Sequence, residues 1–159
     1  MNGTLVKNEL IFDFASGALS ASKSIFTSTY LFLNNRASNL NSTFEGLLGD
    51  SLLENKDTPV SKLKYTDCIT DKTKSKKQDS DQFGPLSKII GPLDKIKWKQ
   101  IFKGFNEFTA KISGDDELKL IKMDPGSSVP LHSHGGKEYI LVLEGSFCDE
   151  YGKYSRGDI

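Results

Sequence analysis

The chain has 159 residues, of which 36% are hydrophobic and 26% are charged, and its formal net charge is zero. This composition is typical of a globular protein with one or two small domains, and it excludes a chain that is disordered throughout. A balanced charge gives no sign of attraction to nucleic acid or to a membrane surface. No apolar run approaches the roughly 18 residues that a membrane-spanning helix needs.

The start of the chain lacks the charged and apolar regions of a signal peptide. The two cysteines, Cys68 and Cys148, lie far apart in the sequence, so no disulfide framework is expected. Such cysteine usage suits a reducing compartment. We therefore expect a cytoplasmic protein.

Residues 8 to about 54 are predicted to form three helices. Asn8 is suited to cap the first helix, and Gly17 to lie near its end. Ser20 or Ser22 is suited to cap the second helix, whose apolar residues recur with the helical period. The third helix is expected over Asn39–Leu53, although two glycines weaken that prediction.

The middle of the chain, residues 55–83, is rich in Lys, Asp, Ser and Thr and poor in apolar residues, which indicates a solvated linker. A short helical turn is expected at residues 86–90. From Trp98 onward the pattern is that of β-strands, and Gly114-Asp115 predicts a hairpin turn. The expected strands are Phe108–Ile112, Glu117–Met123, the buried Glu138–Leu143, and the pair Ser146–Cys148 and Lys153–Ser155, which flanks a turn at Asp149–Gly152.

The last third of the chain contains one motif whose residue types and spacing suit metal binding. It reads G-x5-H-x-H-x3-E-x6-G, from Gly126 through His132, His134 and Glu138 to Gly145, and it contains both histidines of the chain. In extended backbone, residues two apart point to the same face, so the two imidazoles can converge on one point. A carboxylate four residues later can complete a set that suits zinc, non-haem iron, manganese or nickel.

A His-x-His pair alone is as consistent with two surface histidines in a turn-rich loop. The fixed glycines, the acid and the apolar segment after it favour a metal site with His132, His134 and Glu138 as ligands. Glu138 could instead act as a base, but its place in the motif favours a ligand.

The spacing resembles the first motif of the cupins, whose fold is a small antiparallel β-barrel or jelly roll with the metal inside. The stretch PGSSVPLHSHGGKEYILVLEGSFCDEYGKYSRGD resembles, more narrowly, the zinc-binding cupin-like domain of ChrR-type anti-sigma factors. The preceding segment GPLDKIKWKQI fits the same domain. The resemblance implies zinc as the first choice of metal, with iron or manganese as alternatives.

Cupins complete this site with a second motif that begins near a Gly-Asp pair and supplies a further histidine. Here Gly157-Asp158 is followed only by Ile159, so we expect a barrel truncated before that motif. Three ligands would leave a coordination position open. Exposed strand edges would also allow two chains to pair as a homodimer.

The amino-terminal half resembles the helical, zinc-containing anti-sigma domain of the same family. LIFDFASGAL resembles its first helix, and residues 29–38 resemble the end of its second helix, where the family has a His-x3-Cys-x2-Cys motif. Tyr30, Asn34 and Ala37 occupy those ligand positions here, so this zinc site is lost. Apolar packing is expected to replace the metal, and the aromatic candidates for this packing are Phe26, Tyr30, Phe32 and Phe44.

The predicted fold is therefore α+β. A helical anti-sigma-like module over residues 1–55 and a polar linker over 56–84 precede an incomplete antiparallel β-barrel of the cupin type over 85–159. Cys148 is expected to be a buried structural thiol, with a redox role as the alternative. Cys68 is expected to be exposed in the linker.

The resemblance implies a regulatory protein that binds an extracytoplasmic-function (ECF) sigma factor, touches no nucleic acid itself, and responds to oxidative stress through its metal. A second hypothesis is an enzyme, a cupin dioxygenase or isomerase with iron or manganese, because an open coordination position serves catalysis. No second acid or base for proton transfer is evident, which favours a protein that is not an enzyme. A third hypothesis is a degenerate relative without activity.

Overall fold

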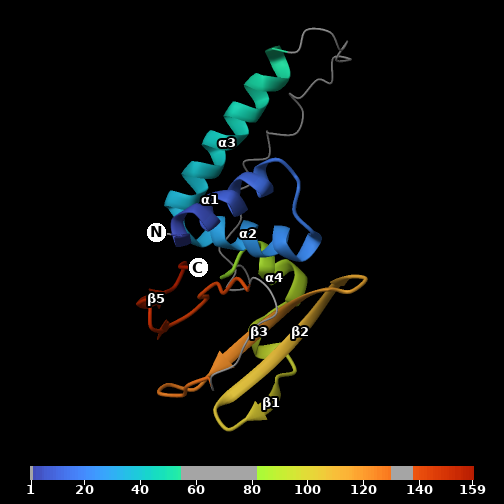
Figure 1. The fold of residues 1–159 in the computed structure, drawn as a ribbon. Coiled ribbons are helices and arrows are strands. Elements are labelled where there is room, and N and C mark those ends of the chain that lie inside the picture. The colour runs from blue at the N-terminus through green and yellow to red at the C-terminus, as the bar shows by residue number, and fades with distance from the viewer. Residues whose placement is uncertain (1, 55–81, 130–137) are drawn as a thin grey trace.

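The computed structural model describes residues 2–54, 82–129 and 138–159, and within the first range the side chains of residues 6–52. The described elements, in chain order, are α1 (Asn2–Ala15), α2 (Ala21–Leu33), α3 (Asn35–Glu54), α4 (Pro85–Ile90), the 3-10 helix η3 (Leu93–Lys95), β1 (Lys99–Phe102), β2 (Phe105–Ser113), β3 (Asp116–Met123), β4 (Ser146–Cys148) and β5 (Lys153–Ser155). The predicted α+β fold, with helices first and antiparallel strands after them, is confirmed (Figure 1).

The first helix begins earlier than predicted, because Asn8 lies within α1 and not at its start. Val6 and Leu10 lie one turn apart on the helix and are half-buried and buried, so the inward face continues toward the amino terminus. The end of α1 is as predicted. Gly17 has a φ of +74°, and hydrogen bonds from Gly17 N–H to Phe14 O (3.1 Å) and from Ala18 N–H to Asp13 O (2.9 Å) close a Schellman motif.

Helices α2 and α3 are separated by a single residue, Asn34. Ser20 is the residue before α2, as predicted. Helix α3 starts at Asn35 and not at Asn39, because the Asn34 side chain accepts a hydrogen bond from the Ala37 N–H (3.1 Å) and so supplies a cap four residues earlier. Figure 1 shows α3 extending away from the other helices toward its carboxyl end.

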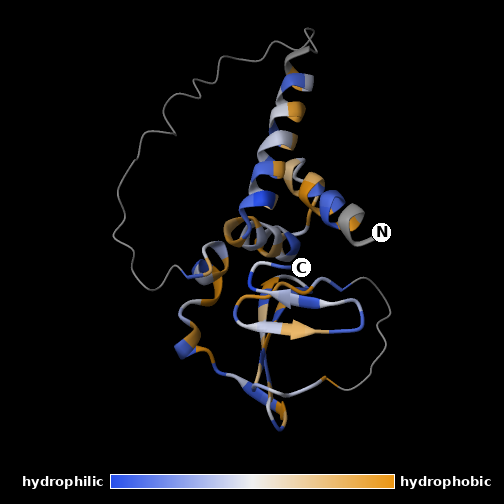
Figure 2. Cartoon of the chain, turned by 90° about the vertical axis from the view of Figure 1, so that its left-hand side faces the viewer, coloured by the Kyte–Doolittle hydropathy of each residue, from blue (hydrophilic) through white to orange (hydrophobic). Residues whose placement is uncertain are grey.

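Strands β1, β2 and β3 form one antiparallel sheet, and β4 and β5 form a separate hairpin. The turn at Gly114-Asp115 joins β2 to β3 as predicted, and pairs such as Phe108 with Leu120 set the register. The predicted hairpin of β4 and β5 is also confirmed. Among the described residues the two sheets do not close into a barrel. Figure 2 shows the β4–β5 hairpin beneath the helices and beside the longer sheet.

One predicted strand is wrong. Residues 138–143 are extended but form no strand. Their backbone meets a neighbour at Val142, which donates to Asp158 O (3.0 Å) and accepts from Gly157 N–H (2.9 Å). A strand needs a ladder of several such pairs, and among the described residues the backbone pairing of this segment with residues 157–158 is at Val142.

The core joins both ends of the chain. Ile11, Tyr30 and Ala37 are buried together, and the half-buried residues packed on them are Leu31, Leu40, Phe44, Leu141 and Ile159. Helix α2 is the central element, because it contacts α1, α3, α4, β2 and β3. The residue before α4 also packs on it: a Cβ added at the buried Gly84 would lie 2.6 Å from the Phe32 ring.

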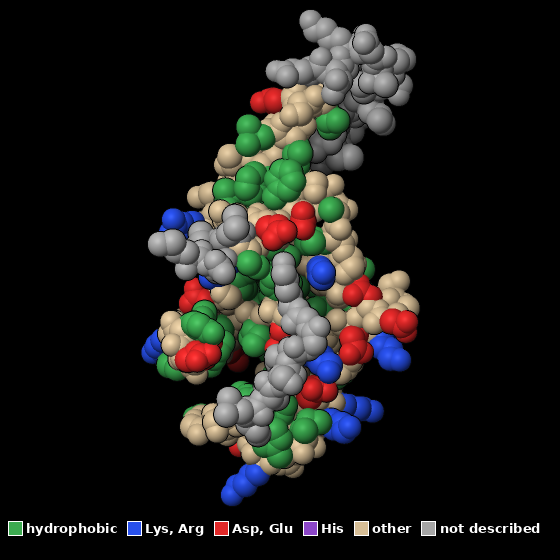
Figure 3. All heavy atoms as spheres, viewed as in Figure 1, with side chains coloured by type: hydrophobic (Ala, Val, Ile, Leu, Met, Phe, Trp, Pro, Cys, Tyr) green, Lys and Arg blue, Asp and Glu red, His purple; other side chains and the backbone are tan. Residues whose placement is uncertain are grey.

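Several large apolar side chains remain on the surface. On α1 and α3 they include Phe12 (43% exposed), Leu47 (60%) and Leu52 (75%). Figure 3 shows hydrophobic side chains gathered along the visible face of α3. Among the described residues, no helix combines the length and the apolar character needed to cross a membrane.

Candidate functional site

The predicted metal motif begins at a turn after β3. Gly126 has a φ of +80°, which glycine adopts readily, and Ser127 N–H donates to Asp124 O (3.0 Å). His132 and His134 lie outside the described residues. Glu138 is the first described residue after them and is exposed. Two imidazoles and a carboxylate form a donor set that zinc accepts, so the residue types of the motif fit a metal.

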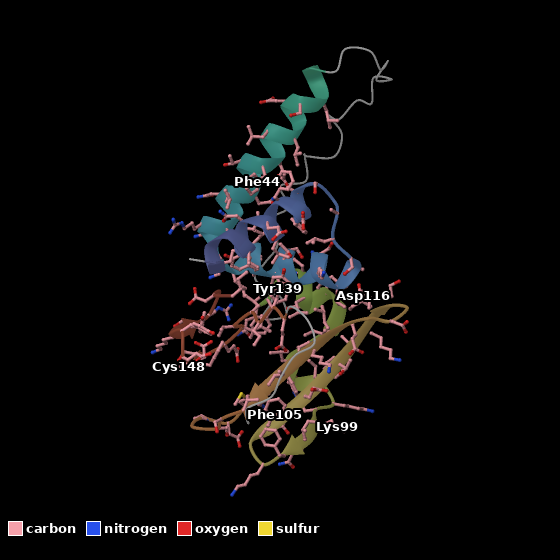
Figure 4. All side chains as sticks on the ribbon, viewed as in Figure 1. Phe44, Lys99, Phe105, Asp116, Tyr139 and Cys148 are labelled. Atoms are coloured by element: carbon pink, nitrogen blue, oxygen red, sulfur yellow. The ribbon has the colours of Figure 1, made fainter. Side chains whose placement is uncertain are left out.

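The segment that follows Glu138 packs beneath α2 (Figure 4). The Tyr139 ring lies 6.1 Å from the Phe26 ring of α2. Leu141 packs on the helical core, and Val142 is buried. The carboxyl end of the metal motif is therefore held directly against the helical module.

Tyr30, Asn34 and Ala37, the positions predicted to have lost zinc ligands, lie close together at the junction of α2 and α3. Tyr30 and Ala37 are 7% and 4% exposed and pack on Ile11. Asn34 lies between them and donates from its side-chain amide to Gly157 O (2.9 Å). Burial raises the pKa of the Tyr30 hydroxyl.

Two of the four aromatic candidates for core packing lie in or against the helical core. Tyr30 lies in the core, and Phe44 packs against it, edge-on to the Phe12 ring at 5.4 Å. Phe26 contacts Tyr139 instead. Phe32 is not a core filler, because it is 51% exposed and turns toward Gly84 on the other side of α2.

The amino end of α2 is capped by a residue from the sheet. The Asp116 carboxylate accepts hydrogen bonds from the Ser22 N–H (2.7 Å) and from the hydroxyls of Ser22 and Ser20. The bonds from Ser22 lower the pKa of Asp116 below its ordinary value. A carboxylate at a helix amino terminus also interacts favourably with the helix dipole, so this contact ties the β2–β3 hairpin to the helical module (Figure 4).

A second tie is made by Arg156. Its guanidinium donates to Leu143 O (2.8 Å) and to Gln82 O (3.0 Å), and it lies 5.3 Å from the centre of the Phe83 ring. Arg156 therefore joins three segments that are far apart in the sequence. Neither Asp116 nor Arg156 was expected from the sequence, because nothing local to either residue indicates its partner.

The prediction of a buried Cys148 is wrong. Cys148 is a free, exposed cysteine on β4. The rings of Phe147 and Tyr154 stack at 4.9 Å on the half-buried face of the β4–β5 hairpin, while Cys148 next to Phe147 is exposed. Cys68 lies outside the described residues.

Comparisons with known proteins give one consistent result. The family model described as the ChrR Cupin-like domain matches residues 87–159. The anti-sigma-E factor ChrR of Cereibacter sphaeroides is 24% identical over 162 residues, which cover 97% of this chain and 76% of ChrR. The crystal structure of Rhodobacter sphaeroides SigE in complex with the anti-sigma ChrR contains a similar chain, with a TM-score of 0.77, 24% identity, and coverage of 95% of this chain and 81% of that one. Along nearly its whole length, therefore, this chain resembles the ChrR-type anti-sigma factors in sequence and shares their fold.

Proposed function

We propose that this protein is an anti-sigma factor of the ChrR type, which binds an ECF sigma factor through its helical module. The observation that carries the proposal is the match to ChrR in the same order over 97% of the chain, helices first and cupin-like part second. The similar solved chain was crystallised with SigE, which gives the class of the partner. Loss of the amino-terminal zinc ligands does not oppose this role, because the contact surface is helical and its core is packed without them.

The exposed apolar side chains of α3 supply a surface for such a partner. Leu40 and Phe44 of α3 are half-buried against the core, and Leu48 and Leu52 continue the same apolar stripe toward the carboxyl end of the helix. Leu47 beside this stripe and Leu52 at its end are 60% and 75% exposed. Burying such side chains against a partner removes apolar surface from water and favours binding.

The direct test is binding to a purified ECF sigma factor from the same genome, measured by calorimetry. We expect a stable complex, and Leu47→Asp and Leu52→Asp should each weaken it about 5- to 30-fold, as for an interface side chain worth about 1–2 kcal/mol. Ile121→Asp is the matched control, because Ile121 is 48% exposed but lies on β3. Failure to bind any such sigma factor would overturn the proposal, and equal loss in all three variants would move the surface away from α3.

We also infer that the cupin-like part binds a metal through His132, His134 and Glu138, with zinc as the first choice and iron or manganese as alternatives. The donor types and their spacing support this. When bound, a metal with three protein ligands would offer an open position to a small molecule. The chain's own contribution is to hold Glu138 close to the Tyr139–Phe26 contact, beside α2.

Elemental analysis of protein purified without chelator tests the metal site, beside a His132→Ala/His134→Ala variant. About one zinc per chain, absent from the variant, is the expected result. Iron in its place would direct attention to oxygenase or isomerase activity. No metal in either protein would mean that the site does not form in this chain, and would favour a degenerate relative.

Three further statements belong to the same proposal. The division into a helical module at 1–55, a linker at 56–84 and a cupin-like part at 85–159 follows the change in composition along the chain. We also propose an oxidative signal and a cytoplasmic location, which the resemblance to ChrR-type anti-sigma factors supports. Pairing of two chains through open strand edges is supported by the exposed edge strand β1.

A further inference from the structure

The last four residues, Arg156–Ile159, lie against the junction of α2 and α3, and they are called the docked segment here. Gly157 is buried, with a φ of +84°, and a Cβ added to it would lie 3.0 Å from the carbonyl oxygen of Leu33. Any side chain at this position would push the docked segment away from the end of α2. Glycine is therefore required here by both its φ and the close backbone approach.

One side chain connects the docked segment to both helices. Asn34 donates from Nδ2 to Gly157 O (2.9 Å), accepts the Ala37 N–H at Oδ1 (3.1 Å), and donates its own N–H to Tyr30 O (2.9 Å). The same residue thus ends α2, begins α3 and holds the docked segment. Ile159 adds apolar contact with the core cluster of Ile11, Tyr30 and Ala37.

The docked segment is also joined to the carboxyl end of the metal motif. Gly157 N–H donates to Val142 O (2.9 Å), and Val142 N–H donates to Asp158 O (3.0 Å). Arg156 donates to Leu143 O (2.8 Å). A continuous run of hydrogen bonds therefore leads from Val142, four residues after Glu138, through Gly157 to Asn34.

We propose that the docked segment sets the geometry of the α2–α3 junction, so that the cupin-like part controls the direction of α3 through Asn34. This inference rests on the proposed function only where it concerns a sigma factor. A displacement of Val142 would break the bonds to Gly157 and Asp158, release Asn34 from Gly157, and free α3 to move relative to α2. Because α3 carries the exposed apolar surface, the result would be a change in partner binding.

Hydrogen exchange of the full chain, without a partner, tests the connection. Gly157→Ala should speed exchange of the Asn34 and Ala37 amides at least tenfold, although both lie more than a hundred residues away in the sequence. Gly145→Ala is the matched control, because Gly145 also has a positive φ (72°) but a Cβ there would meet no atom within 4 Å. Faster exchange confined to residues 142 and 156–159 in Gly157→Ala would overturn the proposal.

A second variant changes Asn34, the other partner of the hydrogen bond to Gly157, and so keeps the test decisive if Gly157→Ala fails to fold. Asn34→Asp retains an oxygen that caps α3 but removes the donor to Gly157 O. Because coupling is reciprocal, the Val142 and Gly157 amides should then exchange at least tenfold faster. Unchanged exchange at Val142 and Gly157 would refute the connection.

The effect on sigma-factor binding is measured in a separate experiment. In the calorimetric assay, Gly157→Ala should change affinity for the ECF sigma factor at least threefold more than Gly145→Ala does. Equal affinities would show that the connection does not reach the binding surface. If the unaltered chain binds no sigma factor, the proposed function fails, while the exchange results still decide whether the docked segment controls the junction.

Discussion

Replacing Ile11 with alanine tests whether apolar packing alone holds the helical module together. Ile11 is 1% exposed and packs on Tyr30 and Ala37, two positions where apolar packing is proposed to take the place of zinc ligands. Removing three carbons from a fully buried side chain costs about 2–5 kcal/mol, from lost burial and from the cavity that remains. The neighbours are held by two other helices and cannot easily fill that cavity, so we expect about 3 kcal/mol.

Thermal and urea unfolding followed by circular dichroism would measure this loss. For a chain of this length each kcal/mol lowers Tm by about 2–4 °C, so Ile11→Ala should lower it by about 6–12 °C. Leu52→Ala is the control, because Leu52 is 75% exposed and its replacement should change stability by less than about 0.5 kcal/mol. A loss below about 1 kcal/mol for Ile11→Ala would refute the view that this cluster replaces the metal.

Three further predictions concern single residues. Hydrogen bonding lowers the folded-state pKa of Asp116, so its stabilising contribution is present above its unfolded pKa and is lost as the pH falls below about 4. Between pH 7 and pH 3, the free energy of unfolding measured with urea should therefore fall more steeply for the unaltered chain than for Asp116→Asn. Gly84→Ala should lower Tm more than Gly91→Ala, since both have a positive φ but a Cβ at Gly84 alone would clash with Phe32; similar Tm values would contradict the packing of this segment on α2. Cys148 should be alkylated by a maleimide in the folded protein, as peptide mass spectrometry can measure, and protection until unfolding would contradict its exposed position on β4.

The elements that were predicted correctly are those determined by residues close together in the sequence. The hairpin around Gly114-Asp115 and the turn at Asp149–Gly152 need only two short strands and a residue pair that favours a turn, and both are present as predicted. The end of α1 likewise depends on Gly17 alone. The start of α3 was missed by four residues because its cap, Asn34, is an ordinary loop residue in sequence and acts only once α2 ends beside it.

The features that were missed depend on contacts between distant residues. Asp116 lies 94 residues from Ser22. It is adjacent to a second aspartate, Asp115, and the sequence does not indicate which of the two contacts α2. The segment 138–143, which is apolar after Glu138, predicts a strand because burial and strand formation produce the same pattern over six residues. In the structure Tyr139 and Leu141 are half-buried against helices while Ile140 between them is 48% exposed, and no periodicity in the run itself could indicate those helical partners.

The arrangement around α2 explains how a signal in the cupin-like part could reach a partner on the helices. The helix is 13 residues long, about 20 Å, and the cupin-like part contacts it at its start through Asp116, in its middle through Tyr139, and just past its end through Gly157. Contacts at both ends of a rigid helix resist its rotation, so α2 moves with the cupin-like part as one body. The carboxyl half of α3 instead extends beyond these contacts and is joined to α2 through Asn34. A change in the cupin-like part therefore has its largest effect on the direction of α3, which carries the exposed apolar residues Leu47 and Leu52.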